Sequence, residues 1–166
     1  MINFKIRNFE KKDFTEIYKW ENDQLALKNS FTKKKFSYEN HYLWCYDKLR
    51  SNNFYIHIFY NNNKKLGLVK VKKNKSIGII SINLNPKFRG KKLSTKFLLK
   101  SEQELSGKIK ILRAYVYKSN YKSVKMFTKC GYKKIMFFDD KIKFEKKNYR
   151  WITIRNFTKK KINPKL

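Results

Sequence analysis

Apolar and polar residues follow one another along this chain in patterns that predict short strands and amphipathic helices. Four segments of the first half are apolar throughout or alternate with polar residues, and both patterns favour strands. The last three of these segments are separated only by short polar turns, so we expect them to form an antiparallel meander. The four predicted strands are Ile2–Arg7, Phe54–Tyr60, Leu66–Val71 and Ile77–Leu84.

Helical spacing of apolar residues marks four other segments. Asp13 and Ser37 are the expected caps of two early helices. The polar segment Glu21–Lys35 between them is expected to be a loop with room for one short helix. Two later helices are predicted over Lys92–Ser106 and from Ser119 or Asn120 to Lys129, the second followed by Gly131.

Three further strands are predicted in the last third of the chain, at Ile109–Tyr117, Tyr132–Phe138 and Tyr149–Asn156, with the charged segment Asp139–Lys147 as a connection. The expected fold class is therefore α/β, an α+β mixed sheet in which an antiparallel meander is followed by a βαβαβ unit. The length suits one domain over residues 1–157, with a basic tail over 158–166.

A formal net charge of +30 is the most unusual feature of the composition. One interpretation is a polyanionic partner such as nucleic acid or an anionic membrane. However, 36 lysines and only 6 arginines carry this charge, and they are spread along the whole chain. Nucleic-acid readers favour arginine, whose planar fork matches phosphates and guanine edges. We therefore expect no specific nucleic acid or membrane partner, and a general attraction for anionic small molecules.

The remaining composition is typical of a cytoplasmic protein. Low-complexity tracts, a 20-residue apolar run and a secretory N-terminus are absent from the sequence. Cys45 and Cys130 lie far apart without metal-binding spacing, so we expect two reduced, partly buried thiols. We expect a monomer or a homodimer.

One basic turn, Asn85–Ser94, joins the predicted strand Ile77–Leu84 to the helix that follows it. Pro86 cannot donate to a ladder and should end the strand. A strand, a glycine-containing turn and a helix in this order bring backbone N–H groups and a helix N-terminus to one place, which suits a phosphate or pyrophosphate. A simple strand-to-helix connection is the alternative interpretation of this turn alone.

A second segment lies about thirty residues further on, where Asn120 and Ser123 precede Phe127 and Cys130–Tyr132. Together with the turn, it resembles the GNAT superfamily of acyl-CoA N-acyltransferases. That family has the patterns Arg/Gln-x-x-Gly-x-Gly/Ala and Asn-x-x-Ser/Ala…Gly-Phe/Tyr. The similarity covers Ser76–Tyr132, with Lys92 and Ser94 in place of the two small residues of the turn.

The resemblance implies the GNAT fold, with two central strands that splay apart around acetyl-CoA as co-substrate. It also implies that backbone groups of one strand pair with the pantetheine arm, that the turn holds the pyrophosphate, and that the Asn120 segment contacts the CoA arm. The implied cofactor-binding residues are Ile82, Asn83, Leu84, Arg89, Gly90, Lys91, Lys92, Leu93, Ser94, Asn120 and Ser123. A plain helix cap is the alternative role for Asn120.

The family usually has a tyrosine seven residues after the Asn, and here that position is Phe127. Either the CoA thiolate leaves without that phenol, or another hydroxyl such as Tyr121 or Tyr132 supplies the proton. We favour Tyr121 because it adjoins Asn120. Because neither Cys45 nor Cys130 has a His or Asp neighbour in the sequence, we expect direct attack by the amine in a ternary complex.

The N-terminal third is similar to one branch of the family, the N-acetyltransferases of nucleotide-linked amino sugars such as the pseudaminic acid pathway enzyme. The similar residues are Trp20, Asn22, His41 and Trp44. An aromatic ring can stack on a base or sugar, and a histidine can bind a phosphate or relay a proton. The four residues are thus candidate acceptor-binding residues, with His41 also a catalytic candidate. Core packing is the alternative for the tryptophans and for His41.

The sequence therefore predicts an acetyl-CoA-dependent N-acetyltransferase acting on a small amine, with the amino group of a nucleotide-linked amino sugar as the favoured acceptor. Glu21 and Glu39 are further candidate bases. A protein or ribosomal N-terminal acetyltransferase is the alternative within the class. A non-catalytic basic nucleic-acid-binding module and an inactive GNAT scaffold are the alternatives outside it.

Overall fold

A computed structural model describes residues 2–148 of the chain. Seven strands and five α-helices, with two short 3₁₀ turns, make up this part. The strands are β1 (Lys5–Asn8), β2 (Phe54–Asn61), β3 (Lys64–Asn74), β4 (Ile77–Leu84), β5 (Ile111–Tyr117), β6 (Lys133–Phe138) and β7 (Lys141–Lys147). The α-helices are α1 (Phe14–Glu21), α2 (Gln24–Asn29), α3 (Tyr38–Arg50), α4 (Leu93–Glu104) and α5 (Tyr121–Lys129).

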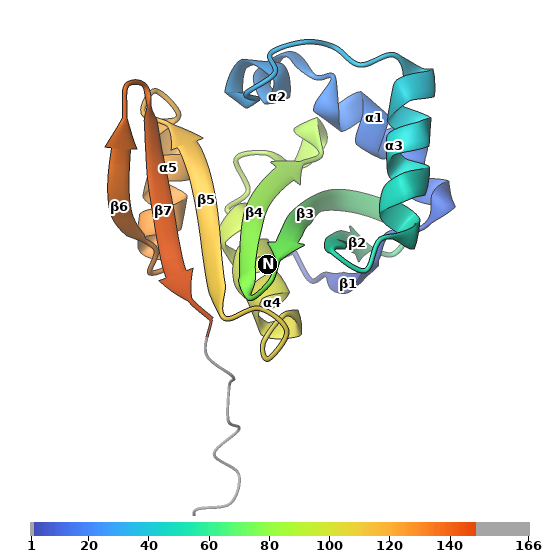
Figure 1. The fold of residues 1–166 in the computed structure, drawn as a ribbon. Helices are drawn as coiled ribbons and strands as arrows, with labels where there is room; N and C mark the ends of the chain where they lie inside the picture. Colours follow the sequence, from blue (N-terminus) through green and yellow to red (C-terminus); the bar gives the residue numbers. More distant parts are fainter. Residues whose placement is uncertain (1, 149–166) are drawn as a thin grey trace, which may run out of the picture.

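The strands form one sheet in the order β1-β2-β3-β4-β5-β7-β6. All neighbours are antiparallel except β4 and β5, which are parallel because α4 connects them. The predicted meander is confirmed as β2-β3-β4, and the predicted mixed α/β class is confirmed with it. Figure 1 shows β1–β4 with α1–α3 on one side of the molecule and β5, β6 and β7 on the other.

β4 and β5 part after a short contact. They pair only from Ile77 opposite Ile111 to Ile79 opposite Arg113, at one end of both strands. β4 continues to Leu84 and stays paired with β3, whereas its other side has no partner strand beyond Ile79. The predicted splaying of the two central strands is thus present (Figure 1). It leaves backbone N–H and C=O groups of residues 80–84 free of sheet hydrogen bonds on the β5 side.

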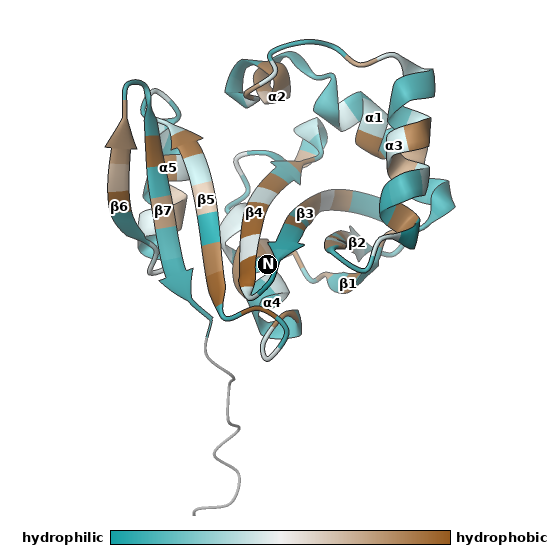
Figure 2. Ribbon diagram, viewed as in Figure 1, coloured by the Kyte–Doolittle hydropathy of each residue, from teal (hydrophilic) through white to brown (hydrophobic). Residues whose placement is uncertain are grey.

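Two hydrophobic clusters hold the helices to opposite faces of the sheet. One cluster joins Leu68, Ile56 and Ile58 of the strands to α1 and α3. The other joins the opposite sheet face to α4 and α5, with the stacked rings of Phe59 and Phe97 4.1 Å apart near its middle. In Figure 2 hydrophobic brown segments alternate with hydrophilic ones along β4, β5 and β7, as expected for strands with one buried face.

The C-terminal strand differs from the prediction. The charged segment that we expected to be a connection forms β7, and only Asp139 and Asp140 make the turn. Ile142 and Phe144 of β7 are buried, and lysines alternate with them on the other face. Long lysine side chains can keep their charged ends in water beside such a strand. The strand predicted at 149–156 and the basic tail at 158–166 lie outside the described residues.

Local capping bears out most of the predicted helix starts. Ser37 caps α3 by accepting from the N–H of Asn40, and Asn120 caps α5 by accepting from the N–H of Ser123. Asp13 is the N-cap residue of α1 as predicted, but its side chain does not cap that helix, because its buried carboxylate accepts hydrogen bonds from Arg7 and pairs with Lys65 instead. Within residues 2–148 no helix is both long and apolar enough to cross a membrane.

Candidate active site

The splayed strands open into a cavity of about 1090 Å³. Its walls come from three parts of the chain that are distant in sequence: the α2–α3 region, the unpaired half of β4 with the turn that follows it, and the end of β5 with the start of α5. The carboxyl ends of both strands therefore face the cavity, which is where ligands bind in open α/β sheets. The cavity provides the candidate active site.

The turn after β4 leads into a helix whose N-terminus is free to bind an anion. Side chains cap α2, α3 and α5, whereas no side chain caps the first turn of α4. Gly90 and Lys92 in this turn have positive φ angles of 79° and 57° and both line the cavity. Free N–H groups at a helix N-terminus attract phosphate, and the lysine adds charge. The local geometry fits the predicted pyrophosphate turn.

The turn residues differ in what they contact. Arg89 and Ser94 line the cavity with Gly90 and Lys92. Lys91 instead holds its ammonium 4.9 Å from the ring of Phe88, outside the cavity wall. Leu93 is buried in the core cluster beneath the turn. These two can therefore serve a ligand only through their backbone groups.

Arg89 connects the turn to the helix α2. Its guanidinium donates to Asp23 Oδ2 at 2.6 Å, and the same carboxylate caps α2 by accepting from the N–H groups of Leu25 and Ala26. Burial would raise the pKa of Asp23, but the hydrogen bonds from Arg89 and from the helix outweigh it and lower that pKa. The predicted pyrophosphate turn and the α2 wall of the cavity are thus joined by one ion pair.

The start of α5 forms the cavity wall that faces the predicted pyrophosphate turn. Asn120 and Ser123 both line the cavity. Since Asn120 Oδ1 caps the helix, both the proposed ligand contact and the plain capping role are compatible with its position, through different atoms. On the β4 side, Ile82, Asn83 and Leu84 also line the cavity beside the unpaired strand edge.

The two tyrosines considered as proton donors differ in whether they reach the cavity. Phe127 lies in the wall, and its ring packs on Tyr132 and Phe144, so no phenol stands at that position. Tyr132 is buried in the core and does not line the cavity, which excludes it as the alternative proton donor. Tyr121 lines the cavity and its side chain is 77% exposed.

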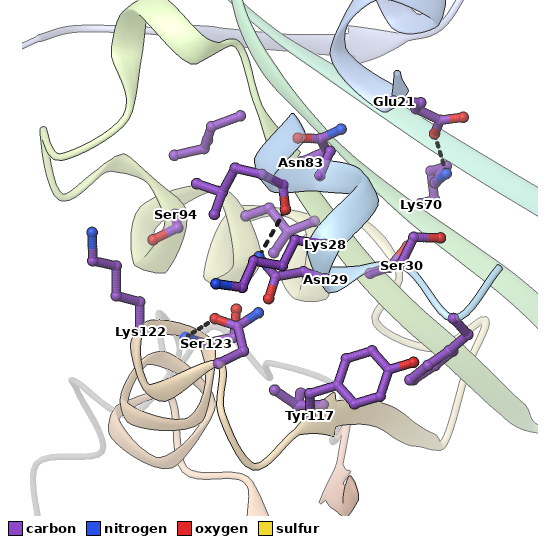
Figure 3. A pocket seen from close by; sticks show the side chains of 18 of the residues that line it. Glu21, Lys28, Asn29, Ser30, Lys70, Asn83, Ser94, Tyr117, Lys122 and Ser123 are labelled. Carbon is purple, nitrogen blue, oxygen red and sulfur yellow. Dashed lines mark hydrogen bonds and ion pairs between the residues drawn. The ribbon is translucent and has the colours of Figure 1, made fainter. Parts of the chain in front are cut away.

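Three polar groups meet at the other end of the cavity. Glu21, the last residue of α1, forms an ion pair with Lys70 of β3 through Oε1, and its Oε2 lies 3.9 Å from His41 Nδ1. The other ring nitrogen of His41 lies 3.0 Å from the carbonyl oxygen of Phe14. Burial lowers the pKa of His41, and the charge of Glu21 opposes that effect. Figure 3 shows Glu21 and Lys70 across the pocket from Ser94, Lys122 and Ser123.

The four predicted acceptor residues divide into two pairs. His41 and Trp44, one helical turn apart on α3, both line the cavity. Trp20 is only 4% exposed and packs in the core cluster under α1, so its side chain cannot meet an acceptor. The side-chain amide of Asn22 is engaged by both backbone groups of Phe36 and thereby ties down the loop before α3. Trp20 and Asn22 therefore have structural roles, in core packing and in holding the loop before α3.

A family model supplies the decisive comparison. Residues 12–132 match the model of the acetyltransferase (GNAT) family. The chain belongs to the GNAT family. It is accordingly an acyltransferase that uses acetyl-CoA as co-substrate for N-acetylation, and a non-catalytic nucleic-acid-binding module is no longer a tenable alternative. No curated protein matches the chain at a significant level.

Solved structures support the GNAT fold. A spermidine N-acetyltransferase from Vibrio cholerae in complex with CoA and spermine has a TM-score of 0.79 and 14% identity, covering 87% of this chain and 95% of its own. An N-acetyltransferase from Staphylococcus aureus Mu50 has a TM-score of 0.76 and 24% identity, with coverages of 89% and 99%. A dodecameric structure of the Vibrio enzyme has a TM-score of 0.73 at 15% identity, covering 87% of this chain and 94% of its own.

The cysteines of this GNAT protein correct one expectation. Cys45 does have a histidine neighbour, because it follows His41 by four residues on α3 and its sulfur lies 3.2 Å from His41 Nε2. Burial nevertheless raises the pKa of the Cys45 thiol to about 12. Burial also raises the pKa of Cys130, and neither cysteine lines the cavity. Neither thiol is therefore suited to carry an acetyl group.

Sequence reasoning missed two features of the GNAT site. The Asp23–Arg89 ion pair joins residues 66 positions apart, and its only local signal was the position of Asp23 just before a helical turn. The second feature is an aromatic pair in the cavity wall, where half-exposed Phe31 meets the buried Tyr117 ring edge-on at 5.2 Å. The ammonium groups of Lys33 and Lys141 each lie 5.1 Å from one of these rings.

Proposed function

We propose that the protein transfers an acetyl group from acetyl-CoA to the amino group of a nucleotide-linked amino sugar. The charge of the cavity is the observation that carries this proposal. Five basic side chains line it, whereas Glu21 is the single carboxylate among the described lining residues and is already paired with Lys70. The basic residues are Lys28, Lys70, Arg89, Lys92 and Lys122.

This charge argues against the acceptor of the structural neighbours. Spermidine and spermine carry several positive charges, and a site for them requires carboxylates to pair with those charges. In this cavity a polyamine would meet like charges, in a protein whose formal net charge is +30. A nucleotide-linked sugar carries phosphates that Lys28, which lies outside the turn proposed to hold the pyrophosphate, can attract.

Aromatic side chains supply the second line of support. Trp44 lines the acceptor end, and Phe31 and Tyr117 also line the cavity with two lysines beside their rings. We propose that the nucleobase stacks on Trp44 or Phe31 while its phosphates meet the ammonium groups.

The chemistry that we propose is direct transfer. The amine lone pair attacks the thioester carbonyl carbon, the C–N bond forms, the C–S bond breaks, and the nitrogen loses a proton while the sulfur gains one. Backbone groups at Ile82, Asn83 and Leu84 are proposed to orient the pantetheine arm and the carbonyl, and the helix N-terminus of α4 is proposed to hold the pyrophosphate. Tyr121 is the proposed proton donor to sulfur, and a slower thiol release by Tyr121→Phe would support it.

An acceptor series tests the proposed function. Thiol release from acetyl-CoA is measured with a nucleotide-linked amino sugar, the same amino sugar without its nucleotide, spermidine, and a peptide with a free N-terminus. We expect the highest kcat/KM with the nucleotide-linked sugar. Higher kcat/KM with spermidine, or with the peptide alone, would refute the amino-sugar acceptor and favour a polyamine or protein N-terminal acetyltransferase.

A charge-reversal pair sharpens this test. Lys28→Glu changes a cavity residue, whereas Lys19→Glu makes the same change at an exposed position outside the cavity wall. We expect Lys28→Glu to lower kcat/KM for the nucleotide-linked sugar about tenfold, equivalent to about 1.4 kcal/mol, and Lys19→Glu to leave it unchanged. Equal effects of the two variants would show that only the overall charge matters.

A further inference from the structure

The polar cluster at the acceptor end contains a carboxylate that the proposed chemistry has not yet used. Trp20, the residue before Glu21, accepts a hydrogen bond through its carbonyl from Asn83 Nδ2 at 3.0 Å. Lys70, the ion-pair partner of Glu21, lies opposite Ser81 in the β3–β4 register. Both contacts fix Glu21 beside the cavity-lining half of β4, where the thioester is proposed to lie.

The hydrogen bonds of His41 determine which of its nitrogens can take a proton. Nε2 lies 3.0 Å from a carbonyl oxygen, which can only accept, so the neutral ring carries its hydrogen on Nε2. Nδ1 then presents a lone pair toward Glu21 Oε2. Two proton-accepting atoms therefore face each other across 3.9 Å, which is longer than a hydrogen bond, so the two side chains must move closer before they can share a proton.

Other charged and titratable groups lie around the pair. Lys70 holds Glu21 Oε1 in an ion pair, which leaves Oε2 to face His41. The remaining titratable neighbours of His41 are Cys45, a buried thiol on its own helix, and Tyr18 of α1, whose ring lies 5.5 Å away. The charge that faces His41 comes from Glu21 and Lys70.

We propose that Glu21 is the general base of the reaction and that His41 is the positioning residue that shares the proton which Glu21 receives. This inference rests on the proposed N-acetyl transfer to an amine. As the amine attacks, its nitrogen gives one proton to Glu21. The CoA sulfur takes a different proton from its own donor, and Glu21 returns its proton to water after product release.

The test compares two matched variants. Glu21→Gln keeps the shape of the side chain and removes its ability to accept a proton. Glu104→Gln makes the same change at an exposed position on α4, outside the cavity wall. We expect Glu21→Gln to lower kcat by about 10²–10⁴-fold, the usual contribution of a general base, and to leave the acetyl-CoA Kd unchanged. Glu104→Gln should match the wild type in both.

The pH profile gives a result that a purely structural role would not produce. We expect the activity of Glu21→Gln to depend more steeply on pH than that of the wild type, because without the side-chain base solvent must take the proton of the attacking amine. His41→Asn should shift the wild-type profile without abolishing activity. Glu21→Gln with wild-type kcat and the wild-type profile would overturn the proposal.

The comparison is made with whichever acceptor the wild type uses. If the nucleotide-linked sugar is inactive and another amine is acetylated, the proposed acceptor fails and the Glu21 comparison proceeds with that amine. If no amine is acetylated, the variants are compared by their slow hydrolysis of bound acetyl-CoA, because water also needs a proton acceptor when it attacks the thioester. The two proposals therefore fail by different results.

Discussion

At the scale of single residues, Lys92 departs most clearly from what its position requires. It occupies the left-handed region at φ 57°, just before α4, where GNAT proteins commonly have glycine. A side chain with a Cβ costs about 1 kcal/mol in this conformation relative to glycine. The protein tolerates that cost at the turn proposed to hold the pyrophosphate, where the ammonium of Lys92 contributes a positive charge.

We predict that Lys92→Gly stabilises the protein by about 1 kcal/mol because it removes this strain. Lys91→Gly is the control, since Lys91 has no positive φ and gains nothing from glycine. The free energy of unfolding from urea titration measures both. A Lys92→Gly variant no more stable than Lys91→Gly would contradict the prediction.

The sequence predicted cavity-lining residues correctly where helical spacing put two suitable side chains on the same face. His41 and Trp44 are three positions apart on one helix, so a single face presents both to the cavity. Trp20 and Glu21 are neighbours on α1, and successive helical residues point in directions about 100° apart. Trp20 therefore faces the core and Glu21 the cavity. A sequence without helix orientation could not tell which of the two faces the cavity.

At the scale of elements, β2 and α4 are linked by a buried polar contact within an apolar interface. His57 Nδ1 lies 3.0 Å from Ser101 Oγ, and both residues are buried. Burial lowers the pKa of His57 to about 4, so the ring is neutral at pH 7. Protonation would place a charge between the sheet and its helix.

The sign of the resulting pH dependence follows from this lowered pKa. Below about pH 6.5 the unfolded chain binds a proton at His57 that the folded protein does not, so stability falls as the pH decreases toward 4. We predict a loss of about 2 kcal/mol from this residue between pH 8 and pH 5. Urea unfolding at both pH values should show that His57→Gln loses less stability than the wild type. Equal losses would contradict the prediction.

Element prediction succeeded where hydrophobic pattern and turn chemistry agreed. β4 matches the predicted Ile77–Leu84, and α5 begins at its predicted cap. It failed at β7, because lysine fills so many positions of this chain that a half-buried strand has the composition of a loop. Only the alternation of Ile142 and Phe144 with charged residues distinguishes the two.

At the scale of the whole molecule, the carboxylates of the described chain are mostly engaged by lysine or arginine, as in the exposed pairs Lys12–Glu10 and Lys100–Glu104. Exposed pairs of this kind contribute little to stability. The net charge of +30 remains largely uncompensated and concentrates anions near the protein. For the proposed acceptor this field speeds encounter, and the advantage decreases as salt is added.

The parting of β4 and β5 has a consequence for cooperativity. A continuous ladder would tie all seven strands into one unit, whereas here the two halves share the ladder only from Ile77 to Ile79. We expect amide hydrogen exchange in the absence of ligand to report two opening units, one with β1–β4 and one with β5–β7. Bound acetyl-CoA would contact both units. It would then slow exchange in both units at once. Between β4 and β5 it would supply the link that a paired strand would otherwise provide, and its release would remove that link.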